Sequence, residues 1–318
     1  MAMNKKGMFF TLIAIAFIVV FVFTFTFRIS SRLTNQMQIV DSRISGVNEF
    51  ILDLERDTER GLYISSYRTL LAMEEYIINQ GEFIDNVNSA FEELLINGTF
   101  NGTTPSLIKS STFTQWTEQV AAEGNNFHLT TNIVLGELTI EQNDPWKIIV
   151  SAEIEYYIED QTGSSRWNYS KIITTTIPIL GFEDPIYIVN SFGRMTNIIQ
   201  ETPYSGNYSY QLLGDWYTEN LVSHINYSYY EANPSAPSFL MRLENNLSPS
   251  QYGIESMVNL KKVSDFGLPI DSDASIVDYM YWTGNNEGDY RINNTANWVR
   301  VDLAHLNYYN LTEVSFLD

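Results

Sequence analysis

The sequence predicts an α+β protein built on a long N-terminal helix, and three observations carry this prediction. Residues 8–27 form an uncharged apolar run, apolar residues recur at helical spacing directly after it, and three segments between residues 127 and 177 alternate between apolar and polar side chains. Spacings near 3.6 and 2 residues indicate amphipathic helices and half-buried strands, respectively. The predicted parts are a transmembrane and coiled-coil-like helix, a helical hairpin, an antiparallel β-meander packed on a helix and a small C-terminal α+β unit. The predicted domains are the anchor at residues 1–27, the extended helix and helical hairpin at 28–103, the helix with the meander at 104–205, and the α+β unit at 206–318.

The apolar run at residues 8–27 predicts a membrane anchor. Lys5 and Lys6 precede it, and its length in a helix matches a hydrocarbon core of about 30 Å. The apolar stretch of a cleavable secretory signal is shorter, at about 7–15 residues, and ends at small residues, whereas this run leads into Phe27 and Arg28. We therefore expect a single-pass protein of the cell membrane, with the lipid bilayer as a partner and the C-terminal domains extracellular. Basic residues on both sides of the run leave its orientation open.

A seam of apolar residues at 4,3 spacing follows the anchor and is typical of coiled-coil a and d positions. Its members are Leu33, Met37, Val40, Ile44, Val47, Ile51 and Leu54. Without proline before Pro105, the helix is free to continue to about Ile78, with Gly46 and Gly61 as places where it would bend or stop. The seam packs either on another subunit or on this chain's own second helix or sheet. Residues 82–96, after Gly81, supply such a helix.

The segment 104–205 predicts a meander covered by one helix. Thr104 and Pro105 indicate a helix start, and that helix carries Phe113, Trp116 and Val120 on one face and ends at Gly124. The strands are expected at 127–135, 146–158 and 167–177, joined by turns at 143–145 and 161–164. The proline-bounded segment 181–204 is expected to be an edge strand or a linker. Beyond it, residues 216–225 and 238–245 predict helices, and apolar runs lie at 256–260, 275–282 and 298–306.

Composition excludes several functions. The net charge of −20 argues against nucleic-acid binding, and the absence of cysteine removes disulfides and thiolate metal sites. Phosphate-binding, dinucleotide and nucleophile-elbow motifs are missing, and the three histidines, His128, His224 and His305, are too far apart in sequence for a helical zinc pair. We therefore expect no catalysis and no cofactor.

Asp271, Asp273 and Asp278 are weak candidates for a cation site. Their spacing begins like an EF-hand loop, but Ile276 and Trp282 occupy positions that need Gly and Glu. The alternative is that Asp273 or Ser272 caps a helix carrying Ile276, Val277 and Met280.

Eight Asn-x-Ser/Thr sequons follow the anchor and are candidates for glycosylation, which favours an outside location, as does the scarcity of lysine. They are Asn97, Asn101, Asn168, Asn207, Asn226, Asn246, Asn293 and Asn310. Aromatic pairs such as Trp216 and Tyr217, close to Asn and Asp residues, offer flat faces on which sugars could stack.

A long N-terminal helix whose outer half covers an antiparallel meander resembles the type IV pilins, including their archaeal branch. Lys5, Lys6 and Gly7 ahead of the apolar run resemble a class III signal, which implies processing at Lys6, Gly7 and Met8 by a prepilin peptidase that cuts after Gly7. Most pilins carry Glu at the fifth mature position, where this chain has Leu12, so the resemblance implies a minor component rather than the main filament subunit.

The resemblance implies a membrane-anchored extracellular protein, structural or adhesive and non-catalytic. Its partners would be other surface or pilin-like subunits, bound through the N-terminal helix. Two alternatives remain: a single-pass ectodomain that binds or senses an extracellular ligand such as a glycan, and an enzyme that processes surface polymers.

Overall fold

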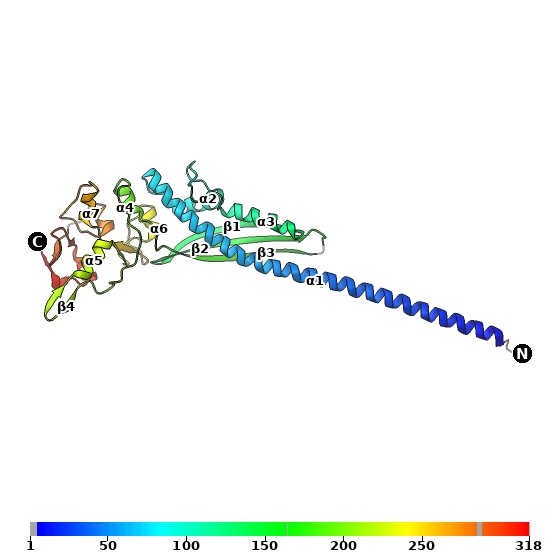
Figure 1. Cartoon of the computed structure of the whole chain (residues 1–318). Coiled ribbons are helices and arrows are strands. Elements are labelled where there is room, and N and C mark those ends of the chain that lie inside the picture. Colours follow the sequence, from blue (N-terminus) through cyan, green and yellow to red (C-terminus); the bar gives the residue numbers. More distant parts are fainter. Residues whose placement is uncertain (1–4, 164, 285–287, 318) are drawn as a thin grey trace. The chain divides into compact units, whose positions relative to one another are not determined.

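The protein is α+β with antiparallel sheets (Figure 1). The computed structural model describes residues 5–163, 165–284 and 288–317, and within the first helix the side chains of residues 5–8, 11, 29–36 and 39 lie outside the description. The described chain divides into two compact units, residues 1–58 and 59–318. The α+β class is therefore as predicted.

Helix α1, Lys5–Gln80, continues through both glycines at which a bend or stop was expected. Gly61 has a packing reason instead, because a β-carbon added there would lie 2.6 Å from the indole ring of Trp116. Only glycine lets the ring approach the helix so closely. Gly81, with φ +71°, follows the last residue of α1, as the hairpin prediction required.

The predicted membrane-spanning segment is wrong. Across the described residues, no helix is both long and apolar enough to cross a bilayer. This finding also overturns the single-pass localisation, which depended on that segment.

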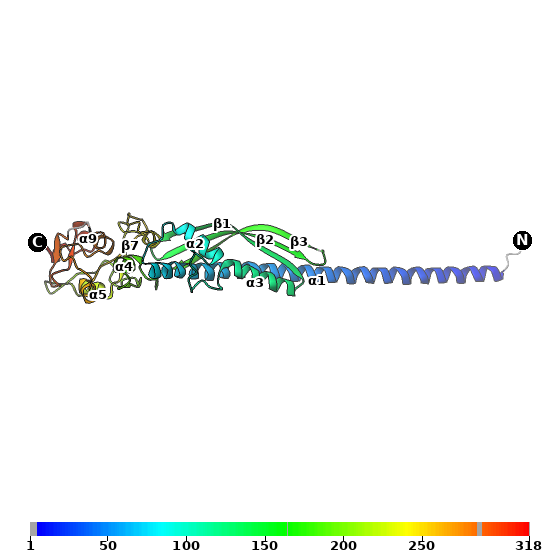
Figure 2. The same cartoon turned by 90° about the horizontal axis from the view of Figure 1, so that it is seen from above.

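The meander is confirmed and is longer than predicted. Its strands, in the order β1-β2-β3, are β1 Leu129–Asp144, β2 Lys147–Asp160 and β3 Arg166–Pro178. Figure 2 shows the three strands twisting together. The side chains of β2 alternate as expected, with Ile148, Val150 and Ile154 fully buried. Helix α3, Phe113–Asn126, packs on β1.

Two predicted helix starts were misplaced. Helix α3 begins not at Thr104 and Pro105 but after Thr112, whose hydroxyl accepts from the Gln115 backbone while the Gln115 side chain accepts from the Thr112 backbone. Helix α2, Val87–Asn97, begins five residues later than expected because Asn86 caps it by accepting from the backbone N–H of Ser89.

The C-terminal part consists of short elements. The helices are α4 Pro185–Asn190, α5 Glu219–Tyr227, α6 Phe239–Leu243, α7 Leu260–Asp265, α8 Asp278–Tyr281, α9 Leu303–Tyr308 and the 3₁₀ helix η1 Thr312–Val314. The strands are β4 Tyr210–Leu212, β5 Asp215–Tyr217, β6 Tyr230–Ala232, β7 Ile254–Ser256, β8 Tyr290–Ile292, β9 Arg300–Val301 and β10 Ser315–Leu317.

Two further predictions for this part were wrong. The segment 181–204, where an edge strand or a linker was expected, holds helix α4, because Asp184 caps this helix and Pro185 stands at its first position. Helix α8 begins at Asp278, so neither Ser272 nor Asp273 caps it. An apolar core that includes Tyr187, Leu221, Met257 and Val301 holds many of these short elements together.

Candidate functional site

The C-terminal part contains a fully buried ionic cluster centred on Arg242 of α6. Its Nη1 donates to Asp184 Oδ2 at 2.6 Å and to Asp278 Oδ2 at 3.0 Å, and Nη2 donates to the backbone carbonyl of Ile254. All three charged side chains have zero exposure. Tyr230 also donates to Asp184 Oδ2, at 2.8 Å. The cluster therefore joins α4, α6, α8 and the pair β6-β7.

Burial and charge oppose each other in this cluster. Burial raises the pKa of Asp184 above its usual range, although the Arg242 guanidinium pulls it down. Burial by itself would lower the pKa of Arg242, but the two aspartates outweigh it, so the pKa is raised and the guanidinium stays charged. One cation facing two carboxylates in a dry interior is an arrangement that ties elements together rather than one that reaches a substrate.

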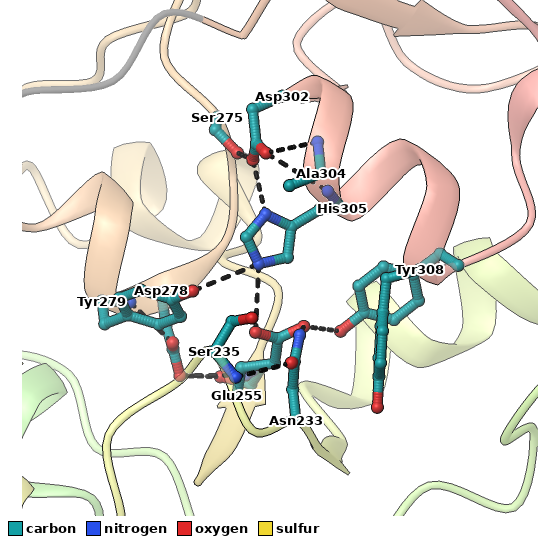
Figure 3. Close-up of polar contacts among 12 residues, drawn as sticks. Asn233, Ser235, Glu255, Ser275, Asp278, Tyr279, Asp302, Ala304, His305 and Tyr308 are labelled. Carbon is teal, nitrogen blue, oxygen red and sulfur yellow. Dashed lines mark hydrogen bonds and ion pairs between the residues drawn. The ribbon is translucent and has the colours of Figure 1, made fainter. Parts of the chain in front are cut away.

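A second cluster surrounds His305 of α9, as Figure 3 shows. Its Nδ1 lies 2.6 Å from Asp302 Oδ2, and its Nε2 lies 3.2 Å from Glu255 Oε2 and 3.2 Å from the Tyr279 hydroxyl. Tyr309 donates to the other oxygen of Glu255 at 2.9 Å. Asp302 also caps α9, accepting from the backbone N–H groups of Ala304 and His305.

Strand β7 links the two clusters. Consecutive side chains of a strand point to opposite faces, so Glu255 meets His305 while Ser256 donates its backbone N–H and its hydroxyl to Asp278 at 2.9 and 2.7 Å. The neighbouring residues Asp278 and Tyr279 are divided in the same way: Asp278 contacts Arg242 in the first cluster, and Tyr279 contacts His305 in the second. The polar interior is therefore continuous.

The chemistry of His305 is that of a fixed cation. Burial would lower its pKa, but the hydrogen bonds with Asp302 and Glu255 outweigh this effect and raise the pKa to about 10. An imidazolium held between two carboxylates cannot accept a proton near neutral pH. Although an acid–histidine–acid row resembles a catalytic triad, this one lacks the free base that general-base catalysis needs.

The other two histidines lie apart from this cluster. Burial lowers the pKa of His224 to about 3, and its Nδ1 lies 3.1 Å from the Thr202 hydroxyl. His128 is exposed next to β1. The structure thus does not bring the three histidines together.

The three aspartates suggested as a cation site do not converge either. Asp278 is committed to Arg242, Asp273 Oδ1 lies 3.4 Å from the Arg300 guanidinium, and Asp271 accepts from the backbone of Asp273. Among the residues that the structure describes, no group of three or more acidic or histidine side chains is placed to hold a metal ion.

The N-terminal unit presents its apolar side chains outward. Large side chains from Phe9 to Phe27 are exposed by between 38%, at Ile13, and 79%, at Phe27. The hydroxyls of Thr24 and Thr26 donate to the carbonyls of Val20 and Val22 in the same helix. This stretch therefore has an apolar surface on every side.

The predicted seam divides into two parts. Met37, Val40 and Ile44 are exposed, by 72%, 49% and 43%, whereas Val47, Ile51 and Leu54 are buried. The side chain of Leu33 lies outside the description, as do those of the predicted processing residues Lys6 and Met8 with the neighbouring Gly7; the backbone of all four belongs to α1. The exposed members remain available to a partner.

All eight sequon asparagines are exposed, which their modification would require. They are Asn97, Asn101, Asn168, Asn207, Asn226, Asn246, Asn293 and Asn310.

One of them, Asn293, lines a cavity of about 910 Å³ beside the hairpin β4-β5. Trp216 and Tyr217, the aromatic pair noted in the sequence, line the same cavity.

Comparison of the chain with protein-family models, curated proteins and solved structures found no match in any of the three. The resemblance to pilins therefore stays a prediction from the N-terminal residues and the order of the elements.

Proposed function

We propose that the protein is a non-catalytic structural or adhesive subunit, similar to a minor pilin, that assembles with other subunits through the N-terminal part of α1. The observation that carries this proposal is the exposed apolar surface of residues 9–27. Seven phenylalanines there, each about two thirds exposed, present on the order of 1,000 Å² of apolar surface, given ~200 Å² for each ring. The largest apolar patch on a monomer usually measures about 300–600 Å².

The distribution of these side chains defines the kind of partner. A helix that packs on one neighbour needs an apolar stripe of about 100° around its axis, whereas the stretch 9–27 of α1 is apolar on all sides. Several neighbouring helices are needed to cover it, as in the interior of a helical bundle or filament. The equivalent helix of other subunits has the matching length and the same apolar character. Met37, Val40 and Ile44 extend the contact along the exposed half of the seam.

The C-terminal clusters support a structural role for the rest of the chain. Arg242 and His305 act as fixed cations between buried carboxylates, and they join short elements that have little regular sheet of their own. In this proposal the N-terminal part of α1 assembles the subunit, and the buried clusters stabilise the C-terminal part of the chain.

The experiment is analytical ultracentrifugation of the full chain, dispersed in a mild non-ionic detergent, with Phe17→Glu and Gln38→Glu as variants. Phe17 is 73% exposed within the apolar stretch, and Gln38 is exposed beyond it. We expect the native chain and Gln38→Glu to form oligomers and Phe17→Glu to be monomeric, because the added carboxylate would be buried without a partner. A native chain that is monomeric at every concentration would refute the proposal.

The proposal includes proteolytic processing of the N-terminus after Gly7. If a prepilin peptidase cuts after Gly7, the mature chain begins at Met8, and mass spectrometry of protein isolated from its own cells gives the corresponding N-terminal peptide. An N-terminal peptide that begins at Met1 in mature protein would contradict this part of the proposal.

A further inference from the structure

We propose that the cavity beside the hairpin β4-β5 binds a neutral saccharide. This inference deepens the proposed function, since it rests on the adhesive role and names the class of ligand. The walls come from β5 and the start of α5, from the loop at Asn293 and Asn294, and from η1. The volume of about 910 Å³ lies within the usual range of roughly 300–1,000 Å³ for small-molecule sites, which accommodates two or three sugar rings.

The walls of the cavity are tied to each other by hydrogen bonds. The Thr218 hydroxyl donates to the Asn293 carbonyl at 3.3 Å, and the backbone N–H of Asn293 donates to the Val314 carbonyl at 2.7 Å. In the hairpin, Tyr210 stacks on Tyr217 with ring centroids 5.4 Å apart and an interplanar angle of 14°. The cavity is therefore formed before a ligand arrives, and binding requires little ordering of the chain.

The aromatic side chains provide the apolar part of the site. Trp216 is half-buried and packs against the C-terminal core, while it also lines the cavity. Tyr217 lines the cavity beside it and is held by Tyr210. A sugar ring presents C–H groups on one face, and a fixed aromatic ring is a suitable surface for that face.

The polar side chains select for hydroxyl groups and against negative charge. Asp215, Glu219 and Glu313 contribute carboxylates, and Asn293 and Asn294 contribute amides. Carboxylates accept strong hydrogen bonds from hydroxyls, and amides both donate and accept. In the described part of the chain, no Lys, Arg or His lines this cavity. Three carboxylates without a basic neighbour would repel uronic acids, sialic acids and phosphates, so the site favours a neutral sugar.

Two sources could supply such a sugar, and they are distinguishable. One is an external neutral oligosaccharide, and the other is a glycan attached to this chain at Asn293, whose sequon lies in the cavity wall. Thr295→Ala destroys the sequon at Asn293 and leaves every residue that lines the cavity unchanged. If the occupant is an external sugar, the native chain and Thr295→Ala bind it with the same affinity when both are produced in glycosylating cells. If only Thr295→Ala binds the external sugar when both are produced in glycosylating cells, the saccharide site holds and its natural occupant is the chain's own glycan.

The test is calorimetric titration of the full-length, unglycosylated chain with chitotriose, maltotriose, cellotriose and mannotriose, and with trigalacturonate as the anionic comparison. We expect saturable binding of at least one neutral trisaccharide and at least tenfold weaker binding of trigalacturonate. Trp216→Leu is expected to weaken binding about tenfold, which corresponds to the loss of roughly 1.4 kcal/mol of stacking.

Trp298→Leu is the matched control, because Trp298 is a half-buried tryptophan that packs against the same core but does not line the cavity. The dissociation constant of Trp298→Leu for the neutral trisaccharide should lie within twofold of the native value. Glu313→Gln removes one of the three carboxylates at an exposed position, so it tests the charge without risk to folding. It should reduce the difference in affinity between the neutral trisaccharide and trigalacturonate. Absence of saturable binding by all four neutral sugars up to 10 mM would overturn the inference. So would unchanged binding by Trp216→Leu.

Phe17→Glu distinguishes this inference from the assembly proposal. The variant is expected to be monomeric and to bind the sugar normally. If the native chain fails to assemble but binds the sugar, the assembly proposal alone fails.

Discussion

Replacement of Arg242 by Met is the most informative test of the buried ionic cluster. The substitution keeps much of the side-chain volume and removes the guanidinium that contacts Asp184 Oδ2 at 2.6 Å and Asp278 Oδ2 at 3.0 Å. Both carboxylates would then lie in a dry interior without a cation. We expect a large loss of stability because an unpaired buried charge is costly.

The magnitude follows from what the carboxylates retain. Removal of one partner from a buried ion pair typically costs about 3–5 kcal/mol. Asp278 would still accept from Ser256, and Asp184 would still accept from Tyr230 and from the backbone of Ile186. These donors place the expected cost of Arg242→Met near the lower end, at about 3 kcal/mol at pH 7.

The loss of stability caused by Arg242→Met is expected to depend on pH in a definite direction. Burial already raises the pKa of Asp184 above the unfolded value of about 3.9, and without Arg242 this pKa rises further. The folded state of the variant therefore binds more protons than the unfolded chain, and its stability increases as the pH falls. A single carboxyl changes stability by at most ~1.4 kcal/mol per pH unit in this window. The cost of Arg242→Met should therefore shrink by about 2–3 kcal/mol between pH 7 and pH 5.

The assay is urea unfolding followed by circular dichroism at both pH values, with Arg166→Met as the control. Arg166 forms an ion pair with Glu159 at 2.7 Å, but its side chain is 62% exposed, so water screens the pair and its loss should change the stability far less than Arg242→Met does. A cost for Arg242→Met below about 1 kcal/mol, or one that does not change with pH, would refute the reasoning.

Three further predictions concern single residues. Burial raises the pKa of Glu74 from 4.5 to about 9, so native stability should fall as the pH rises through this range, and Glu74→Gln should be the more stable protein in urea unfolding at pH 8. The pKa of His305 is raised from 6.5 to about 10, so its stabilising contribution is complete below pH 6.5 and is lost as the pH rises through 10; the difference in unfolding free energy between the native chain and His305→Gln should therefore shrink toward pH 10.5. Gly61→Ala should destabilise by about 1–3 kcal/mol because its β-carbon meets the Trp116 ring, while Gly46→Ala, with open space around it, should change thermal stability by less than about 1 kcal/mol and in the stabilising direction; equal effects would exclude the close approach.

The meander was predictable because its sequence signal is local. Residues such as Ile148, Val150 and Ile154 alternate with polar neighbours over a long run, and one buried face fixes the register.

The first residues of the helices were harder to predict from the sequence, although it contains capping signals. Thr112 and Gln115 form a capping box, and Asp184 before Pro185 is a cap followed by proline at the first position.

The buried clusters could not be predicted from the sequence because their members are distant in the chain. Arg242 lies 58 positions from Asp184 and 36 from Asp278, and only its place in the apolar segment 239–243 hints that it is buried. Asp302 and His305 are three residues apart and share one helix, so this contact was visible, but nothing in the sequence connects them with Glu255.

The central claim, assembly through the apolar part of α1, is tested most directly by site-specific cross-linking between subunits. A photoreactive residue at Phe17, which is 73% exposed, should give cross-links between the N-terminal helices of different copies or of co-purified subunits, and one at Gln38 should give fewer. The account predicts helix-to-helix products identified by mass spectrometry. Only intramolecular products at Phe17, with the chain sedimenting as a monomer, would contradict it.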